Sequence, residues 1–308
     1  MKAQKALAAI AITALSALSL AACSDPDQGG DDAALQLEEQ AKFFDIDSIE
    51  TQPDIAALVP AAVQERGVLR NAASTDYAPA EFRDTDGQTP VGYDIEIIKA
   101  LAKVMGLNEG TTTHAEFATI IPSLGSKFDV GASSFTITPE RLEQVNMVAY
   151  VEVGSSYAVK AGNPSGFDPA DVCGSTIGVQ TGTYQQTLAT EMSDQCVADG
   201  KEAINVMPHD LNTDNVTKLV GGQYDAVLSD STITDWAIES TNGELEQAGE
   251  VIESEAQGIA IAKDDAELTT AVQAAMQYLM DEGILEEILD LYGAGQAGLT
   301  EATLNPGK

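Results

Sequence analysis

The sequence predicts an α/β fold built on mainly parallel sheets. Segments typical of strands alternate with segments typical of helices over most of the chain after Gly67, and this alternation is the pattern of parallel sheets with helices on both faces. The length of 308 residues and the hydrophobic content of 44% suffice for one large or two medium domains. In open sheets of this kind, ligands bind beyond the carboxyl ends of the strands. Short polar and glycine-containing stretches of this chain fall at those ends.

Residues 1–22 are expected to be a lipoprotein signal peptide rather than part of the fold. Two lysines precede the apolar stretch ALAAIAITALSALSL, which is too short and too rich in Ala and Ser for a good membrane helix. The sequence LAAC that follows resembles the bacterial lipobox, in which cleavage precedes the cysteine and the cysteine receives lipid such as palmitate. An ordinary secretory signal with a chance cysteine is the alternative. A lipid on Cys23 predicts an extracytoplasmic protein anchored to the cell membrane.

Residues 23–53 are acidic and rich in small polar groups, so we expect a flexible tether. A helix is expected over 54–66, ended by Gly67. The expected strands are 68–74, 111–117, 128–132, 155–161, 175–180, 202–208, 224–230 and 258–263. The expected helices are 92–105, 139–145, 184–192, 212–222, 231–240 and, as one or two helices, 264–294. The tail after residue 293 is expected to be frayed.

The charge balance excludes a nucleic-acid partner. The formal net charge is -34, and the chain lacks the clusters of Lys and Arg that phosphate binding needs. The acids are scattered, which is typical of a well-solvated surface. No CxxC motif is present and the only two histidines stand far apart, so we expect neither a metal site nor a cofactor.

Three cysteines remain to be explained. Cys23 is used by the lipid in the interpretation above. Cys173 and Cys196 are then an even pair in an oxidising compartment, which favours a disulfide. Free buried thiols are the alternative.

The stretch ASSFTITPER at residues 132–141 suggests an anion site. Thr138 followed by Pro139 is typical of a helix start, with a hydroxyl N-cap and proline at the first helical position. Arg141 then lies in the first turn, where a cation is unfavourable beside the positive end of the helix dipole. Convergence of Arg141 with the hydroxyls of Ser134 and Thr136 on a carboxylate would explain it. Pairing of Arg141 with a neighbouring glutamate is the alternative.

A carboxylate site is half of an amino-acid site, and the other half must hold an ammonium. Asp230 ends the apolar strand YDAVLSD, where a carboxylate would meet the cleft. It is equally well placed to cap the helix that follows. Gly182 and Thr183 lie at another strand end and helix start, where backbone N–H groups and a hydroxyl favour a carboxylate. A plain glycine turn with a threonine cap is the alternative.

Five stretches together resemble the extracellular solute-binding proteins of polar-amino-acid ABC importers. They are VLRNAASTDYAPAEFRDTDGQTPVGYDIEIIKALAKVMGL, FATIIPSLGSKFDVGASSFTITPER, IGVQTGTYQQ, YDAVLSD and GIAIAKDDAEL. The resemblance implies the two-lobed periplasmic-binding-protein type II fold with two hinge crossings. Lobe 1 would be 54–153 plus 257–308, and lobe 2 would be 154–256. It further implies a monomer that captures a polar amino acid by lobe closure and delivers it to a membrane-embedded ABC permease.

The resemblance assigns roles to individual residues. Arg141 would bind the ligand carboxylate together with Ser134 and Thr136, and Asp230 would bind its ammonium. The other implied ligand-binding residues are the turn Gly182, Thr183 and Tyr184 and the aromatic walls Tyr77 and Phe117.

Departures from the family pattern concern specificity. Ala80 stands where an aromatic residue is common, which widens the pocket. Ser74 stands where binders of basic amino acids tend to have an acid, which argues against lysine or arginine. Asp76, Glu81 and Arg83 would either face the pocket or be solvated, and the sequence leaves the choice of ligand open.

Two other functions fit parts of the pattern. The same fold occurs in a periplasmic dehydratase of aromatic amino-acid precursors (cyclohexadienyl or arogenate dehydratase), but this requires a free acid. Asp230 is committed to the ammonium in our interpretation, and no nucleophile–base pair is evident. A sensory module would normally need a membrane helix and a signalling domain, and the sequence shows neither after the signal.

Overall fold

The computed structural model describes residues 43–307 of the chain. The expected signal peptide, Cys23 and the first part of the expected tether therefore lie outside the described residues. The chain from Phe43 onward forms one unit by its internal contacts. Within the described range, no helix is both long and apolar enough to cross a membrane.

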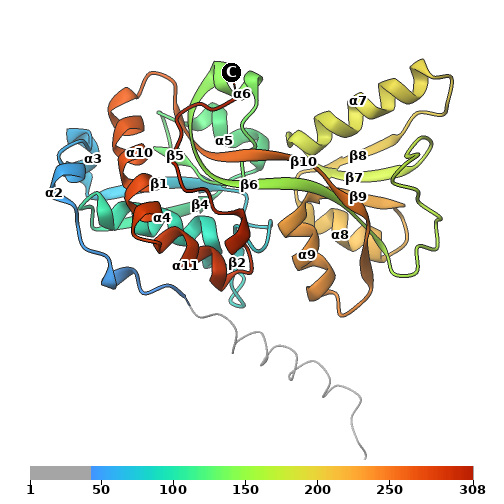
Figure 1. Cartoon of the computed structure of the whole chain (residues 1–308), viewed down its shortest axis with the longest axis horizontal. Coiled ribbons are helices and arrows are strands. Elements are labelled where there is room, and N and C mark those ends of the chain that lie inside the picture. The colour runs from blue at the N-terminus through green and yellow to red at the C-terminus, as the bar shows by residue number, and fades with distance from the viewer. Residues whose placement is uncertain (1–42, 308) are drawn as a thin grey trace, which may run out of the picture. The chain divides into compact units, whose positions relative to one another are not determined.

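An eight-stranded sheet forms the centre of this unit (Figure 1), with the strand order β4-β1-β5-β10-β6-β9-β7-β8. Its strands are β1 (Val68–Ala73), β4 (Glu109–His114), β5 (Val130–Gly131), β6 (Val145–Lys160), β7 (Thr176–Gln180), β8 (Asn205–His209), β9 (Ala226–Asp230) and β10 (Leu245–Ala262). β1 pairs in parallel with β4 and β5, and β7 pairs in parallel with β8 and β9. A separate antiparallel pair consists of β2 (Phe82–Arg83) and β3 (Pro90–Val91). The predicted α/β class is confirmed.

Two long strands join the two lobes of the molecule. β6 and β10 pair antiparallel, from Leu245 opposite Lys160 to Ala262 opposite Val145. In Figure 1 they run from lobe 1, which holds β1, β4 and β5, into lobe 2, which holds β7, β8 and β9. The lobe boundaries expected at 153/154 and 256/257 both fall within these strands.

Helices flank the sheet in both lobes (Figure 1). They are α4 (Tyr93–Val104), α5 (Phe117–Ser123), α6 (Pro139–Gln144), α7 (Tyr184–Ala198), α8 (Asn212–Val220), α9 (Ser231–Ser240), α10 (Ala266–Asp281) and α11 (Ile284–Leu291). Ile97, Leu101 and Val104 share one face of α4 and are fully buried, as its amphipathic pattern predicts. They pack in one core with residues of α10 and α11. Lobe 2 has its own core around Ile177 and Val179.

The helix expected over 54–66 is two helices, α2 (Pro53–Ala56) and α3 (Ala61–Arg66). Pro60 stands between them and precedes α3 directly. Proline lacks an N–H, and its ring clashes with the carbonyl four residues earlier, so one continuous helix cannot form there. Gly67 ends α3 in the left-handed conformation, as expected.

Both ends of the described chain are packed more tightly than the sequence suggested. Residues 43–53, expected in the tether, lie on lobe 1: the N–H of Phe44 donates to Glu96 and that of Gln52 to the Val104 carbonyl. The 3₁₀ helices η1 (Ile46–Ser48) and η2 (Gly295–Ala297) lie near the two ends.

The C-terminal tail, expected to be frayed, follows the outer edge of β6. The N–H of Leu299 donates to the Tyr150 carbonyl, and the N–H of Ala149 donates to the Thr303 carbonyl. The expected strand over 155–161 did not include this part of β6, whose N–H and C=O groups give the tail its partners.

Cys173 and Cys196 form a disulfide, with their Cα atoms 5.6 Å apart. It joins the loop before β7 to the last turn of α7. The disulfide therefore lies at the amino end of β7, while the cleft described below lies at the carboxyl end.

Candidate functional site

A small cavity lies between the lobes, at the carboxyl ends of β7 and β9. It measures about 10 Å³, which is room for about one water molecule, so the lobes stand close together. Its lining residues are Tyr77, Phe117, Ser134, Thr136, Arg141, Gln180, Thr183, Tyr184, Gln185 and Asp230. Eight of these were expected from the sequence. Gln180 and Gln185 were not.

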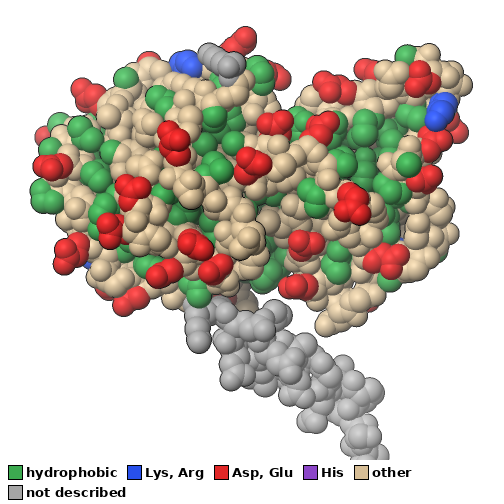
Figure 2. Space-filling view, in the orientation of Figure 1, with side chains coloured by type: hydrophobic (Ala, Val, Ile, Leu, Met, Phe, Trp, Pro, Cys, Tyr) green, Lys and Arg blue, Asp and Glu red, His purple; other side chains and the backbone are tan. Residues whose placement is uncertain are grey.

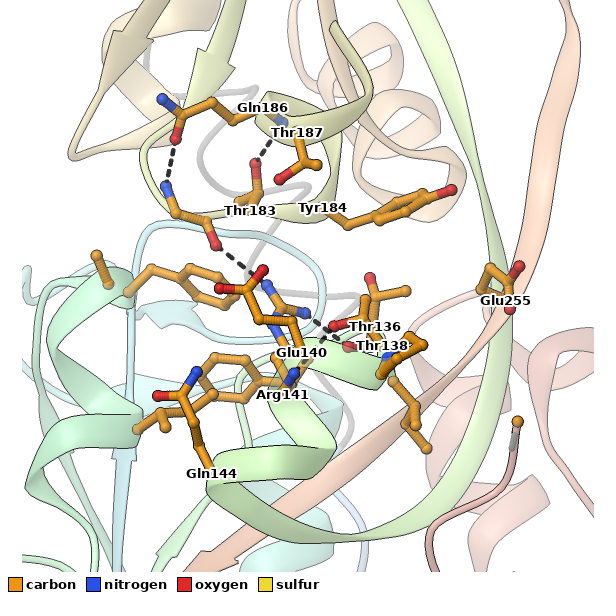
Figure 3. A pocket seen from close by; sticks show the side chains of 18 of the residues that line it. Thr136, Thr138, Glu140, Arg141, Gln144, Thr183, Tyr184, Gln186, Thr187 and Glu255 are labelled. Atoms are coloured by element: carbon orange, nitrogen blue, oxygen red, sulfur yellow. Dashed lines mark hydrogen bonds between the residues drawn. The ribbon is translucent and has the colours of Figure 1, made fainter. Parts of the chain in front are cut away.

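A larger groove of about 830 Å³ opens beside the cavity (Figure 3). Phe117, Arg141 and Thr183 belong to the walls of both, so the groove is the outer part of the same cleft. Gly182, also expected in the site, lines this outer groove. Its φ is +80°, and an added Cβ would lie 2.9 Å from the Cβ of Ala118 across the cleft. Only glycine allows this approach of the lobes.

Arg141 is a buried cation at the boundary between cavity and groove. As predicted, Thr138 caps α6 by accepting from the Arg141 N–H at 3.2 Å, and Pro139 opens the helix. The guanidinium donates from Nη1 to the Thr136 carbonyl at 2.6 Å and from Nη2 to the Gly182 carbonyl at 3.1 Å. Figure 3 shows both contacts, the second of which crosses between the lobes.

The rest of the Arg141 environment is apolar. The rings of Phe117 and Phe135 lie 5.4 and 5.3 Å from the guanidinium carbon. Burial lowers the pKa of Arg141 to about 10. None of the ion pairs among residues 43–307 includes Arg141, so the alternative of pairing with a neighbouring glutamate does not hold. A buried cation that lacks an anion, with guanidinium donors still available, suits a carboxylate ligand.

Asp230 is a buried carboxylate across the same cavity. It stands at the N-cap position of α9, but its side chain makes no capping bond, which decides against the capping alternative. Oδ1 accepts from Gln185 Nε2 at 2.7 Å and Oδ2 from Gln257 Nε2 at 2.9 Å. Burial raises the pKa of Asp230 to about 6. The two amides fix its orientation and supply no charge, so a cation is the missing partner.

The side-chain hydroxyls of three other expected site residues already form hydrogen bonds within the protein. The Thr183 hydroxyl donates to the Gln180 carbonyl and caps α7. The Tyr184 hydroxyl bonds Glu253. Ser134 has a positive φ of 53°, and its hydroxyl donates to Glu81 at 3.3 Å. The N–H groups of Ser134 and Thr183 are also used, by Asp94 at 2.9 Å and by the Gln180 carbonyl at 3.4 Å.

Two more carboxyl groups lie behind the cavity wall. Glu81 accepts from the Ser133 hydroxyl at 2.7 Å, and Asp94 accepts from the Ser134 N–H at 2.9 Å and from the Tyr150 hydroxyl at 2.6 Å. Burial raises the pKa of both, that of Asp94 to about 6. Glu81 is therefore neither solvated nor in the cavity wall, and it holds the loop that carries Ser133 and Ser134.

The family model for bacterial extracellular solute-binding proteins, family 3, matches residues 69–295. The chain belongs to this family. It is 32% identical over 305 residues to the arginine-binding protein ArgT of Corynebacterium glutamicum, covering 98% of this chain and 96% of that protein. It is 28% identical over 230 residues to the L-cystine-binding protein TcyJ of Escherichia coli, covering 73% and 82%.

Solved structures show the same two-lobed fold. An ancestral arginine-binding protein bound to arginine aligns with a TM-score of 0.68 and 29% identity, covering 74% of this chain and 98% of that one. The ancestral amino acid-binding protein AncCDT-1, a precursor of cyclohexadienyl dehydratase, aligns with a TM-score of 0.66 and 27% identity, covering 75% of this chain and 97% of that one. The predicted two-lobed type II fold is therefore confirmed.

The arrangement as a whole presents opposite charges to one small space. The two groups are close enough that Asp230 raises the pKa of Arg141 against the larger effect of burial. Within the described residues, no cluster of His, Cys, Asp and Glu is arranged to hold a metal ion. The charges are placed to bind the two ends of a zwitterion, for which the cavity of about 10 Å³ must widen by a separation of the lobes.

Proposed function

We propose that this protein is the binding subunit of an ABC importer and captures a basic amino acid of the arginine class. The observation that carries the proposal is the pair of buried, unpaired charges, Arg141 and Asp230, on the walls of one cavity. The ligand carboxylate would lie on Arg141 and its ammonium on Asp230. Tyr77 and Phe117 would flank the aliphatic part of the side chain.

The charge balance around the cavity favours a ligand with a net positive charge. Asp230 is buried in the wall and Asp94 behind it, and Asp76 is linked to the lining residue Gln180 through Ser74, while Arg141 is the one buried cation of the lining. In a low-dielectric site this excess of acids stabilises an added cation. The names of the relatives agree, because ArgT and the ancestral structure are arginine-binding proteins.

The absence of an acid at Ser74 argued against such ligands. The Ser74 hydroxyl, however, donates to Asp76 at 2.7 Å. A carboxylate is therefore one hydrogen bond away from the position where binders of basic amino acids tend to carry theirs.

Closure of the lobes would follow from ligand bridging. Arg141 belongs to lobe 1 and Asp230 to lobe 2, so a zwitterion held by both favours the closed form by its differential affinity. The closed form would then be recognised by the permease.

We further propose that the mature protein is a monomer outside the cytoplasm, held at the membrane by lipid on Cys23. The LAAC sequence supports the anchor. The spread of acids over the visible face, without a single large block (Figure 2), supports a solvated exported surface.

The positions and hydrogen bonds of the buried carboxyl groups favour transport over catalysis. Asp230 is held by two amides, and the carboxyl groups of Glu81 and Asp94 lie behind Ser133 and Ser134 rather than in the lining. None of the three is placed like an acid that protonates a leaving group.

The test is a ligand screen on the chain from residue 24 onward. Thermal denaturation is followed with each of the twenty amino acids, ornithine and citrulline, and hits are measured by calorimetry. Arginine at 100 times its Kd should add about 2.7 kcal/mol to the unfolding free energy. Absence of any response to amino acids would contradict the proposal, and dehydration of prephenate or arogenate would favour the enzyme instead.

A further inference from the structure

The far end of the cavity is closed by a chain of polar contacts between the lobes. Ser74 and Asp76 come from the loop after β1 in lobe 1. Gln180 ends β7 in lobe 2, and Asn212 begins α8 in lobe 2. Ser74 and Gln180 are buried, with 0% and 2% of their surface exposed. Sequence reasoning gave no role to Gln180 or Asn212.

The contacts link a helix terminus to the ligand cavity. The Asn212 N–H donates to Asp76 Oδ2 at 2.5 Å, and the Ser74 hydroxyl donates to Asp76 Oδ1 at 2.7 Å. Gln180 Nε2 donates to the Ser74 hydroxyl oxygen at 3.1 Å and to the Asp210 carbonyl at 3.0 Å. Asp76 thus caps α8 across the cleft, and α8 has no side-chain cap of its own. Because the partners belong to different lobes, this series of hydrogen bonds forms only when the lobes are together.

The orientation of the Gln180 amide follows from its partners. A backbone carbonyl can only accept, so the atom facing Asp210 must be the amide nitrogen. Both N–H groups of Gln180 are then used, and its Oε1 accepts from no other described residue. Since Gln180 lines the cavity, this oxygen is an open acceptor for an N–H group of a ligand.

We infer that Gln180 is a specificity-determining residue for the far end of the ligand, and that Asp76 is a positioning residue acting through Ser74. Together they would select a side chain that ends in N–H donors, such as a guanidinium or an amide, and would couple this recognition to lobe closure. The inference rests on the proposed function, because it takes the carboxylate and ammonium of the ligand to lie on Arg141 and Asp230.

The chain of contacts also has a plainer interpretation as a latch that only holds the lobes together. A latch would strengthen binding of every ligand equally. A specificity-determining contact would strengthen only ligands that carry the N–H donors. Arginine and norleucine separate the two interpretations, because norleucine has an aliphatic side chain without donors.

The experiment measures the Kd of arginine and norleucine for the wild type, Gln180→Leu and Asp76→Asn. In Gln180→Leu, one lost hydrogen bond to a charged donor is expected to raise the Kd of arginine at least tenfold, while that of norleucine changes less than threefold. In Asp76→Asn, which also weakens the contact with Asn212 across the lobes, the Kd of both ligands should rise, and that of arginine should rise more. Gln195→Leu, at an exposed position in α7 bonded only to Asp199, is the matched control and should change neither.

Lobe closure can be followed by tryptophan fluorescence. Trp236 is the single tryptophan of the chain, and its ring lies 5.6 Å from that of Phe82, which comes from lobe 1. Its fluorescence on rapid mixing with arginine should show faster ligand release in Asp76→Asn.

The outcomes are distinct. Equal losses for arginine and norleucine, or an arginine Kd within threefold of the wild type in Gln180→Leu, would overturn the inference while the proposed function stands. Failure of the wild type to bind any amino acid would instead refute the proposed function.

Discussion

Replacing Arg141 by methionine separates binding from folding. Methionine keeps the length and apolar stem of the side chain but removes the charge and its donors. In the proposed complex the ligand carboxylate loses two charge-assisted hydrogen bonds, each contributing about 1.5–3 kcal/mol. Allowing for partial compensation, a loss of about 3–5 kcal/mol raises the Kd of arginine about 10²–10⁴-fold.

The same substitution should leave the ligand-free protein as stable as the wild type. Burial lowers the pKa of Arg141 from 12.5 to about 10, which corresponds to about 3 kcal/mol against the charged form. Against this, the carbonyls of Thr136 and Gly182 lose their donor, at about 1 kcal/mol each. The terms nearly cancel, so we expect a Tm within a few degrees of the wild type, or slightly above it.

Calorimetry with arginine and thermal denaturation without ligand provide the two readouts. Arg70→Met is the matched control, because Arg70 binds Asp129 at 2.8 Å and neither residue lines the cavity or the groove. It should lower the Tm and leave the Kd unchanged, the reverse of Arg141→Met. A Kd within tenfold of the wild type in Arg141→Met, or a loss of several kcal/mol in stability, would refute our reasoning about this side chain.

Three further predictions follow from the cleft and from lobe 2. Because the pKa of Asp230 is raised to about 6, its protonation at low pH competes with binding of the ligand ammonium. The Kd of arginine should therefore rise about tenfold as the pH falls from 7 to 5. A Kd that does not change with pH would count against Asp230 as the ammonium site. Gly182→Ala places a Cβ 2.9 Å from that of Ala118 at a φ of +80°, so the substitution should hinder lobe closure and raise the Kd of arginine at least tenfold. An unchanged Kd by calorimetry would mean that the closed, ligand-bound form does not bring Gly182 this close to Ala118. Replacing Cys173 and Cys196 together by alanine should lower the urea-derived unfolding free energy by about 3 kcal/mol with the same Kd, and a changed Kd would show that the bridge also shapes the cleft.

Local chemistry made part of the site predictable from the sequence. Thr138 and Pro139 mark a helix start by their own conformational preferences, and this placed Arg141 in a first turn where it needed an explanation. Asp230 was found because a polar residue ends an apolar strand. The choice between its two roles required the structure, since capping and cleft positions coincide at that residue.

The partners that hold these groups were not predictable in the same way. Gln257 lies in β10, and its amide reaches Asp230 only because β10 returns to the cleft beside β6. A glutamine at such a position has no periodicity or spacing that marks it. The break at Pro60, in contrast, was visible in the sequence, and the expectation of one helix over 54–66 was wrong because proline at that position does not continue a helix.

The tail along β6 has a consequence for solubility. Without it, the segment of β6 around Ala149 would present a row of unsatisfied N–H and C=O groups to any extended peptide, which is a common starting point for aggregation. The bonds that Leu299 and Thr303 make to this segment occupy those groups within the same molecule. Shortened forms of the protein prepared for crystallisation or biosensors should therefore retain the chain through Asn305, which bonds Met147.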